Sequence, residues 1–220
     1  MAAHTLEQLQ DRIDASISWR RIELSALGNE ISRPSRATAS PLARALARSG
    51  TALLYAHWEG FTKESVQAYL DYVAKRRLKM AQLNDGLLQT VFASLHKRMA
   101  SGDPQAVRLL CDAIRRPELA RAPVPRQGIV NTRSNLRFEV LVDILQSVGL
   151  QHEPFKTKKH LIDTSLCDAR NEIAHGRERF PSPREFEDLH ESVMIMMEAL
   201  REAIMAAARE EEYKVSPVGP

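Results

Sequence analysis

This chain is organised around the stretch D-A-R-N-E-I-A-H-G-R, which runs from Asp168 to Arg177. It closes a segment with helical spacing of apolar residues, and Gly176 is the type of residue that commonly ends a helix. Arg170, Asn171 and His175 are therefore expected on the last turns of one helix. An arginine five residues before a histidine is weak evidence alone, because a chain with 31 Lys and Arg residues produces such pairs by chance.

The arrangement of these side chains follows from helix geometry, in which successive residues are about 100° apart. Asn171 and His175 share one polar face, whereas Arg170 lies about 140° from His175. Either Gly176 ends the helix early so that His175 swings, or two copies of the helix face each other. We prefer the second arrangement, which makes the site dimeric. The predicted buried face consists of Ile162, Leu166, Ala169 and Ile173.

Most of the chain has the three-and-four spacing of apolar residues that is typical of amphipathic helices. Aromatic residues make up only 5% and glycines number nine, which also favours helices over sheets. We expect an all-α antiparallel bundle of about seven helices in one domain, residues 1–213. The predicted helices span Thr5 to Ile31, Pro41 to Leu78, Leu87 to Met99, Gln105 to Arg116, Leu136 to Val148, Thr157 to Ala174 and Pro183 to Tyr213.

Two segments lack helical periodicity. Residues 117–133 contain three prolines together with Arg121, Arg126 and Arg133, and we expect a mobile basic loop there. Such a loop can lie along a phosphate backbone, and a plain mobile loop is the alternative. Residues 214–220 are expected to be a disordered tail.

Composition limits the function classes. The 31 Lys and Arg against 28 Asp and Glu permit a nucleic-acid partner without a dense basic stripe. Cys111 and Cys167 lack metal-ligand spacing and are expected to be reduced and buried. No signal peptide and no apolar run of about 20 residues is present, so we expect a soluble, cytoplasmic protein without membrane contact. Phosphate-loop, zinc-protease and hydrolase motifs are missing from the sequence, and no metal or cofactor is expected.

Two stretches resemble the HEPN superfamily, in its bacterial defence or toxin branch. One is R-N-x-x-A-H-G at Arg170 to Gly176, and the other is L-L-Y-A-H-W-E-G-F-T-K at Leu53 to Lys63. The resemblance implies a dimer in which the motif helices of both subunits form a composite cleft. His57 lies within the second stretch, and we expect it to have a structural role.

The resemblance also implies a metal-independent endoribonuclease. In such enzymes the ribose 2′-hydroxyl attacks its neighbouring phosphate. His175 would then be the acid or base, Arg170 the phosphate clamp, and Asn171 a group that orients one of them or contacts the phosphate. The opposing interpretation is that His175 is only a polar residue at a helix end.

Four further cations are predicted to bind the RNA substrate: Arg177, Lys158, Lys159 and Arg126. Some HEPN toxins carry a tyrosine two residues after the histidine, to which an antitoxin attaches a nucleotide. This chain has Arg177 there, which argues against that form of control. A toxin or antiphage effector, with an antitoxin or larger defence complex as a further partner, is the first hypothesis. The second is a non-catalytic module that binds RNA, a nucleotide or a protein through the dimer groove.

Overall fold

The computed structural model describes residues 5–33 and 40–215, and all regular structure in these ranges is helical. This confirms the predicted all-α class, with seven α-helices in the described ranges. The α-helices are α1 (Leu6–Ile31), α2 (Pro41–Lys75), α3 (Asp85–Ala100), α4 (Pro104–Arg115), α5 (Phe138–Ser147), α6 (Ala169–Ala174) and α7 (Pro183–Arg209). Shorter helical segments are η1 (Met80–Gln82), η2 (Glu153–Lys158) and the π-helix η3 (Leu161–Asp168).

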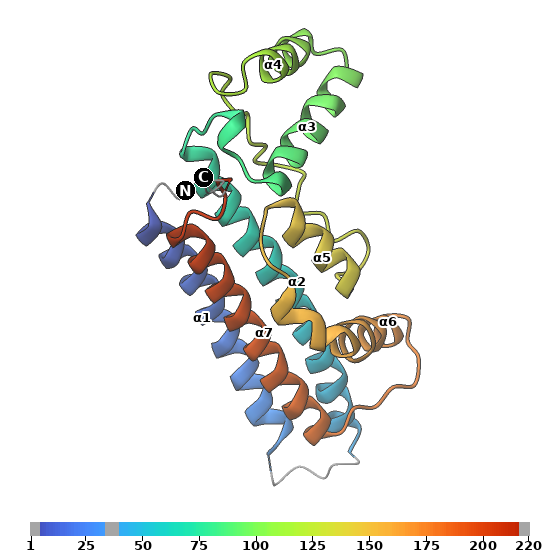
Figure 1. The fold of residues 1–220 in the computed structure, drawn as a ribbon. Coiled ribbons are helices and arrows are strands. Elements are labelled where there is room, and N and C mark those ends of the chain that lie inside the picture. The colour runs from blue at the N-terminus through green and yellow to red at the C-terminus, as the bar shows by residue number, and fades with distance from the viewer. Residues whose placement is uncertain (1–4, 34–39, 216–220) are drawn as a thin grey trace.

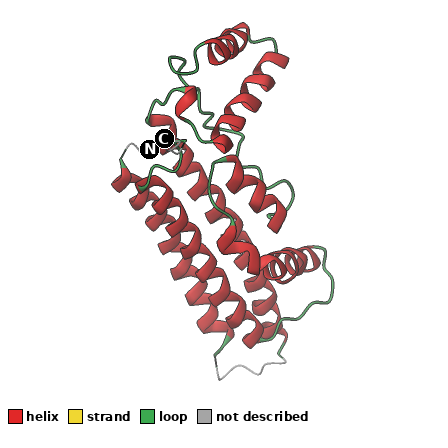
Figure 2. Ribbon diagram, viewed as in Figure 1, coloured by secondary structure: helices red, strands yellow, loops and turns green. Residues whose placement is uncertain are grey.

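The long helices α1, α2 and α7 lie side by side and form the body of the molecule (Figure 1). Helices α3 and α4 pack on each other beyond one end of this body. Helices α5 and α6 lie along the side of α2, joined by the loops shown in green in Figure 2. Helix α2 therefore packs against α1 and α7 and also against the segment that carries the motif.

Local sequence signals explain where several helices begin. Ser40 accepts a hydrogen bond from the backbone N–H of Ala43 (3.1 Å) at the start of α2. Ser182 and Glu185 form a reciprocal capping box at the start of α7. Asn84 and Asp103 are the N-caps of α3 and α4, each with its side chain accepting a backbone N–H. Such side chains satisfy N–H groups that have no partner within the helix, so these starts could be predicted.

The aromatic stripe of α2 faces the core, as its helical spacing predicts. The predicted stripe consists of Leu54, Trp58, Phe61, Ala68 and Tyr72, all at most 5% exposed. Trp58 also packs against Phe155 of η2, with 6.1 Å between the ring centroids. These side chains are therefore core residues and do not form a base-stacking surface.

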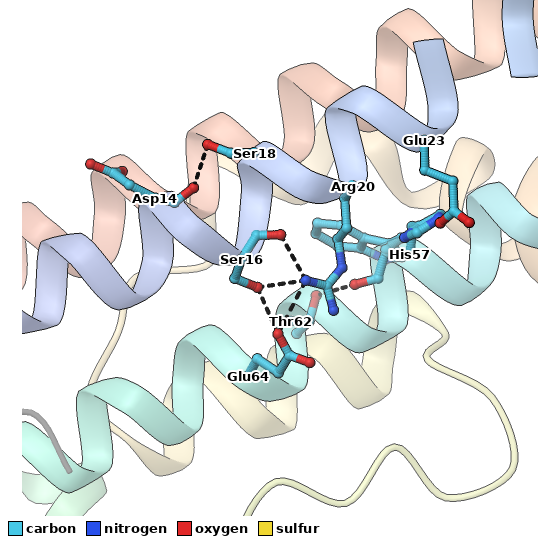
Figure 3. A network of polar contacts seen from close by, with 9 residues as sticks. Asp14, Ser16, Ser18, Arg20, Glu23, His57, Thr62 and Glu64 are labelled. Carbon is cyan, nitrogen blue, oxygen red and sulfur yellow. Dashed lines mark hydrogen bonds and ion pairs between the residues drawn. The ribbon is translucent and has the colours of Figure 1, made fainter. Parts of the chain in front are cut away.

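A buried polar network joins α1 to α2 (Figure 3). Arg20 is only 3% exposed. Its Nη1 donates to the backbone oxygen of Ser16 (2.8 Å), to the Ser16 hydroxyl (2.6 Å) and to Glu64 Oε2 (3.1 Å). The Ser16 hydroxyl in turn donates to Glu64 (2.7 Å). A buried guanidinium needs such partners, because leaving one unpaired costs several kcal/mol.

The segments without periodicity make specific contacts. In the loop 117–133, Ala122 N–H donates to Leu78 (2.9 Å) and the Gln67 amide donates to the carbonyl of Arg126 (2.7 Å). The mobility of this loop stays a prediction. In the predicted tail, Val215 N–H donates to the carbonyl of Gln82 (3.0 Å). The rest of that prediction, residues 216–220, lies outside the described residues. Among the helices described, none is long and apolar enough to cross a membrane.

The first prediction concerns two helical glycines that face the same ring. A Cβ at Gly50 would lie 2.7 Å from Phe186 Cε2, whereas one at Gly28 would lie 3.6 Å from Phe186 Cε1. We expect Gly50→Ala to lower the free energy of unfolding by about 1–3 kcal/mol through overpacking. Gly28→Ala is the matched control and should raise it by up to about 1 kcal/mol, because alanine favours helix. Urea unfolding measures both, and equal effects would contradict the packing described.

The second prediction concerns His57, which is 4% exposed and has its Nε2 2.8 Å from Glu23 Oε2. Burial lowers the pKa of His57, Arg20 lowers it further, and Glu23 opposes both. Because the pKa in the folded chain lies below the unfolded value of about 6.5, protonation favours unfolding. The free energy of unfolding should therefore decrease as the pH falls below about 6.5.

Urea unfolding at pH of about 7.5 and 5.5 tests this linkage. His57→Asn should reduce the difference between the two pH values. His190, whose pKa burial also lowers, contributes the remainder in the same direction. His96→Asn on the exposed face of α3 is the control and should leave the difference unchanged. A His57→Asn variant with the full pH dependence would show that His57 titrates normally in the folded chain.

Candidate functional site

The segment that leads to the motif is not the continuous α-helix predicted for residues 157–174. It consists of the 3-10 helix η2, the π-helix η3 and the short α6. Three contacts from residues just before and within α5 hold η3. Asp163 Oδ1 accepts from Phe138 N–H (2.7 Å), Asp168 Oδ1 accepts from Arg137 (2.6 Å), and the Cys167 thiol donates to the carbonyl of Leu136 (3.3 Å).

The wider turn of η3 changes which side chains face the core. Ile162, Leu166 and Ala169 are buried as predicted, but Ile173 is only half-buried. Cys167 is fully buried beside Leu166, outside the predicted stripe. A π-helix places more residues in each turn than the 3.6 that the prediction assumed, so two adjacent residues reach the interior. π-helical turns occur often at functional sites.

The end of α6 is closed by a Schellman motif at Gly176. The Gly176 N–H donates to the carbonyl of Ile173 (3.1 Å), and the Arg177 N–H donates to the carbonyl of Glu172 (2.9 Å). Gly176 has φ of 71°, which a residue without Cβ adopts at little cost. His175 N–H still donates to the carbonyl of Asn171 (2.9 Å). Gly176 therefore does not release the helix early, and the first of the two arrangements considered for His175 is wrong.

Arg170 is held in place within the single chain. Its Nη1 donates to Asn171 Oδ1 (2.9 Å) and to Asn135 Oδ1 (3.3 Å). Its guanidinium carbon lies 5.0 Å from the ring centroid of Tyr55, a cation–π distance. Asn171 therefore orients Arg170, one of the two roles considered for it. The side chain is half-buried, so part of the guanidinium remains accessible.

His175 is exposed at the C-cap of α6. Its side chain makes no hydrogen bond or ion pair with any residue that the structure describes. The backbone from Arg170 to His175 keeps α-helical spacing. The two side chains therefore point about 140° apart within one chain, as predicted. One chain thus presents a fixed cation on one face of α6 and a free imidazole on another.

The other predicted substrate-binding residues are divided between two regions. Arg177 is exposed directly after the Schellman motif, and its carbonyl accepts from Arg48 of α2 (2.7 Å). Lys158 and Lys159 lie at the opposite end of the motif segment. The Lys159 ammonium is 3.4 Å from both Glu139 Oε1 and Asp163 Oδ2.

Arg126 is not part of this site. Its Nε lies 3.3 Å from Asp71 Oδ1, near the C-terminal end of α2. Asp71 follows Tyr55 by about 24 Å along the helix, at 1.5 Å per residue. The sequence predicts that Arg126 contacts RNA as part of a basic loop, and in the structure this loop packs against the end of α2 that is far from Tyr55.

The sequence did not predict the roles of two residues at this site. Tyr55 lies in the second resembling stretch, which does not show that its ring contacts Arg170. Its hydroxyl accepts the N–H of Leu136 (2.8 Å), and burial raises its pKa above the ordinary value. Asn135 carried no signal, because only the folded chain brings it to Arg170.

Burial raises the pKa of nearby Glu59, but hydrogen bonds from Lys63, Thr132 and Tyr55 outweigh it and lower the pKa overall.

The two cysteines differ in exposure. Burial raises the pKa of Cys167 to about 12, so this thiol stays protonated. Cys111 is exposed on α4, and its predicted burial is wrong. No three His, Cys, Asp or Glu side chains are grouped for metal binding in the described ranges.

The helical fold and the R-N-x-x-A-H-G motif at the end of α6 define a HEPN-type domain. The sequence matches a family model described as RiboL-PSP-HEPN over residues 15–206. Because this match covers most of the 220 residues, the chain belongs to that family within the HEPN superfamily. No curated protein and no solved structure matches the chain. Family membership indicates a nuclease-like or RNA-related module.

The third prediction compares two buried tyrosines of α2. Tyr55→Phe keeps the ring beneath Arg170 but leaves the buried Leu136 N–H without a partner. We expect it to lower the free energy of unfolding by about 1–3 kcal/mol. The hydroxyl of Tyr69, the matched control, is buried without a hydrogen-bond partner in the described residues. Tyr69→Phe should be neutral or stabilising, and equal losses in urea unfolding would contradict the Tyr55 assignment.

Proposed function

We propose that this protein is a metal-independent endoribonuclease whose motif residues act on the ribose-phosphate backbone of RNA. The observation that supports it best is the arrangement at α6. Arg170 is fixed by Asn171 and stacked near Tyr55, while the His175 imidazole is exposed and free. A fixed cation and a free imidazole match the two roles that RNA cleavage requires.

In the proposed reaction the 2′-oxygen forms a bond to the adjacent phosphorus, and the bond from phosphorus to the 5′-oxygen breaks. One imidazole accepts the proton of the 2′-hydroxyl, and an acid returns a proton to the leaving 5′-oxygen. Arg170 holds the phosphate oxygens on which negative charge increases. The products carry a 2′,3′-cyclic phosphate and a 5′-hydroxyl, and DNA is spared because it lacks the attacking hydroxyl.

The site is proposed to be completed by a second copy of the chain. Within one copy, Arg170 and His175 point about 140° apart. Two α6 helices facing each other across a two-fold axis would place both arginines and both histidines in one groove, where one imidazole serves as base and the other as acid. HEPN domains often form dimers, which supports this arrangement.

Arg177 is proposed to add a cation beside His175 in that groove. Lys158 and Lys159 would contact more distant phosphates, and Lys159 would first have to leave Glu139 and Asp163. A role as a toxin or antiphage effector, held silent by an antitoxin or a larger complex, is proposed from the family. Arg177 replaces the tyrosine needed for control by nucleotide attachment, so control by complex formation fits this chain better.

One observation favours a second function, a non-catalytic module that binds RNA, a nucleotide or a protein in the groove. The Arg170 guanidinium already contacts two amide oxygens and an aromatic ring. The role of a guanidinium with these partners would then be to hold the segment before α5 against α6 and α2. Binding without cleavage would then be the property of the groove.

The fourth prediction tests the enzyme directly. Purified protein is incubated with end-labelled single-stranded RNA in EDTA, and the product ends are identified. We expect cleavage with cyclic phosphate ends, and a loss of about 10²–10⁴-fold in His175→Ala because the proton acceptor is removed. Arg170→Ala should be similarly inactive. His96→Ala, which removes an exposed histidine from α3, is the control and should retain full activity.

Light scattering on the same samples separates chemistry from assembly. An inactive His175→Ala protein that is still dimeric supports the catalytic assignment. Full activity of that variant, or activity of a protein that is monomeric throughout the assay, would show that the composite site is wrong. RNA binding without cleavage by the wild-type protein would favour the non-catalytic module.

A further inference from the structure

A second basic region lies at the opposite end of α2 from the motif. It is a cleft of about 440 Å³ between the end of α2, α3, α4 and the loop 117–133. Its volume is in the range of small-molecule sites, about 300–1,000 Å³. The cations that line it are Lys75, Arg77, Arg98, Arg121 and Arg126. No property of the R-N-x-x-A-H-G motif accounts for this cluster.

Three of these cations have no counter-ion among the residues that the structure describes. Arg98 is paired with Asp103 (2.7 Å) and Arg126 with Asp71 (3.3 Å). The side chains of Lys75, Arg77 and Arg121 make no hydrogen bond or ion pair with any residue in the described ranges. Like charges that line one cleft repel each other, so an anion that enters it gains attraction from all three.

The backbone at Arg77 is a second observation that singles out this cleft. Arg77 follows the C-cap of α2 and has φ of 54°, the left-handed region where glycine is usual. This conformation costs a residue that has a Cβ atom about 1 kcal/mol or more. The chain thus carries a long cation at a position where glycine would be more stable, and that cation lines the cleft. Strained residues of this kind cluster at ligand sites.

The cleft also has an apolar wall, formed by Ala74, Leu109, Ala122, Pro123 and Val124. Cations at one side and an apolar wall at the other match a molecule with a phosphate group and a flat apolar part. We propose that this cleft binds a nucleotide, with its phosphates on Lys75, Arg77 and Arg121 and its base against Leu109 and Val124.

The surroundings favour a nucleotide over an RNA strand. An adjoining cleft shares Arg98 and Arg126 but is also lined by Asp71, whose carboxylate would meet an extended phosphate backbone. The unpaired cations converge on one small volume and do not form a track along the surface, which strand-binding grooves require. Lys75 is about 30 Å from Tyr55 along α2, so the cleft is separate from the motif and the proposal does not rest on RNA cleavage.

The fifth prediction is tested by equilibrium titration of the full chain carrying His175→Ala, in which RNA cleavage is expected to be strongly reduced. The probes are ATP, GTP, CTP, UTP, adenosine and a single-stranded RNA, each in EDTA. We expect saturable one-to-one binding of at least one nucleotide and none of adenosine. Arg77→Gly with Arg121→Ala should weaken binding about tenfold or more, because two charge-assisted phosphate contacts are lost. Glycine tolerates the left-handed backbone, so folding should be preserved.

A double variant of α4 is the matched control. Arg108→Ala with Arg115→Ala removes the same charge from exposed positions that do not line the cleft, and affinity should be retained. Equal weakening by both double variants would mean general electrostatic attraction and would overturn the proposal. Failure of all four nucleotides to bind saturably would also overturn it. If only the RNA binds, and Arg77→Gly with Arg121→Ala weakens it, the cleft is a strand site and the nucleotide assignment is wrong.

Discussion

The buried side chain of Tyr55 is the contact on which the geometry of the motif depends. Its ring lies beneath the Arg170 guanidinium, and its hydroxyl accepts the N–H of Leu136 just before α5. Tyr55 sits on α2, which packs against both α1 and α7. Tyr55 thereby holds the motif segment against the three-helix body. This contact stabilises the motif segment, which is too short to be stable alone.

Much of the fold could be predicted because its signals are local. Apolar spacing indicated most of the α-helices, although the helix predicted for residues 157–174 is divided among η2, η3 and α6. In the structure Ser40, Asn84, Asp103 and Ser182 each cap the start of a helix. Each of these residues acts on N–H groups within three positions of itself. Such information is present in the sequence without knowledge of the tertiary fold.

The features that the sequence could not predict depend on distant partners. The π-helix η3 is held by contacts to residues 136–138, and Arg170 is held by Asn135 and Tyr55. No local pattern in α1 indicates that Arg20 is buried against Glu64 of α2 (Figure 3). No local pattern indicates that Arg126 pairs with Asp71 near the other end of α2. In each case tertiary contacts outweighed the local pattern.

In a single chain, the candidate site holds the Arg170 side chain in place but not the His175 side chain. A phosphate clamp stabilises developing charge best when it is fixed beforehand, since it then costs no reorganisation during the reaction. Arg170 meets that condition through Asn171, Asn135 and Tyr55. Among the described residues His175 has no hydrogen-bond or ion-pair partner, so we propose that substrate or a second chain sets its position. If the proposed dimer forms, assembly itself would therefore complete the acid–base pair, and any partner that covers α6 would prevent it.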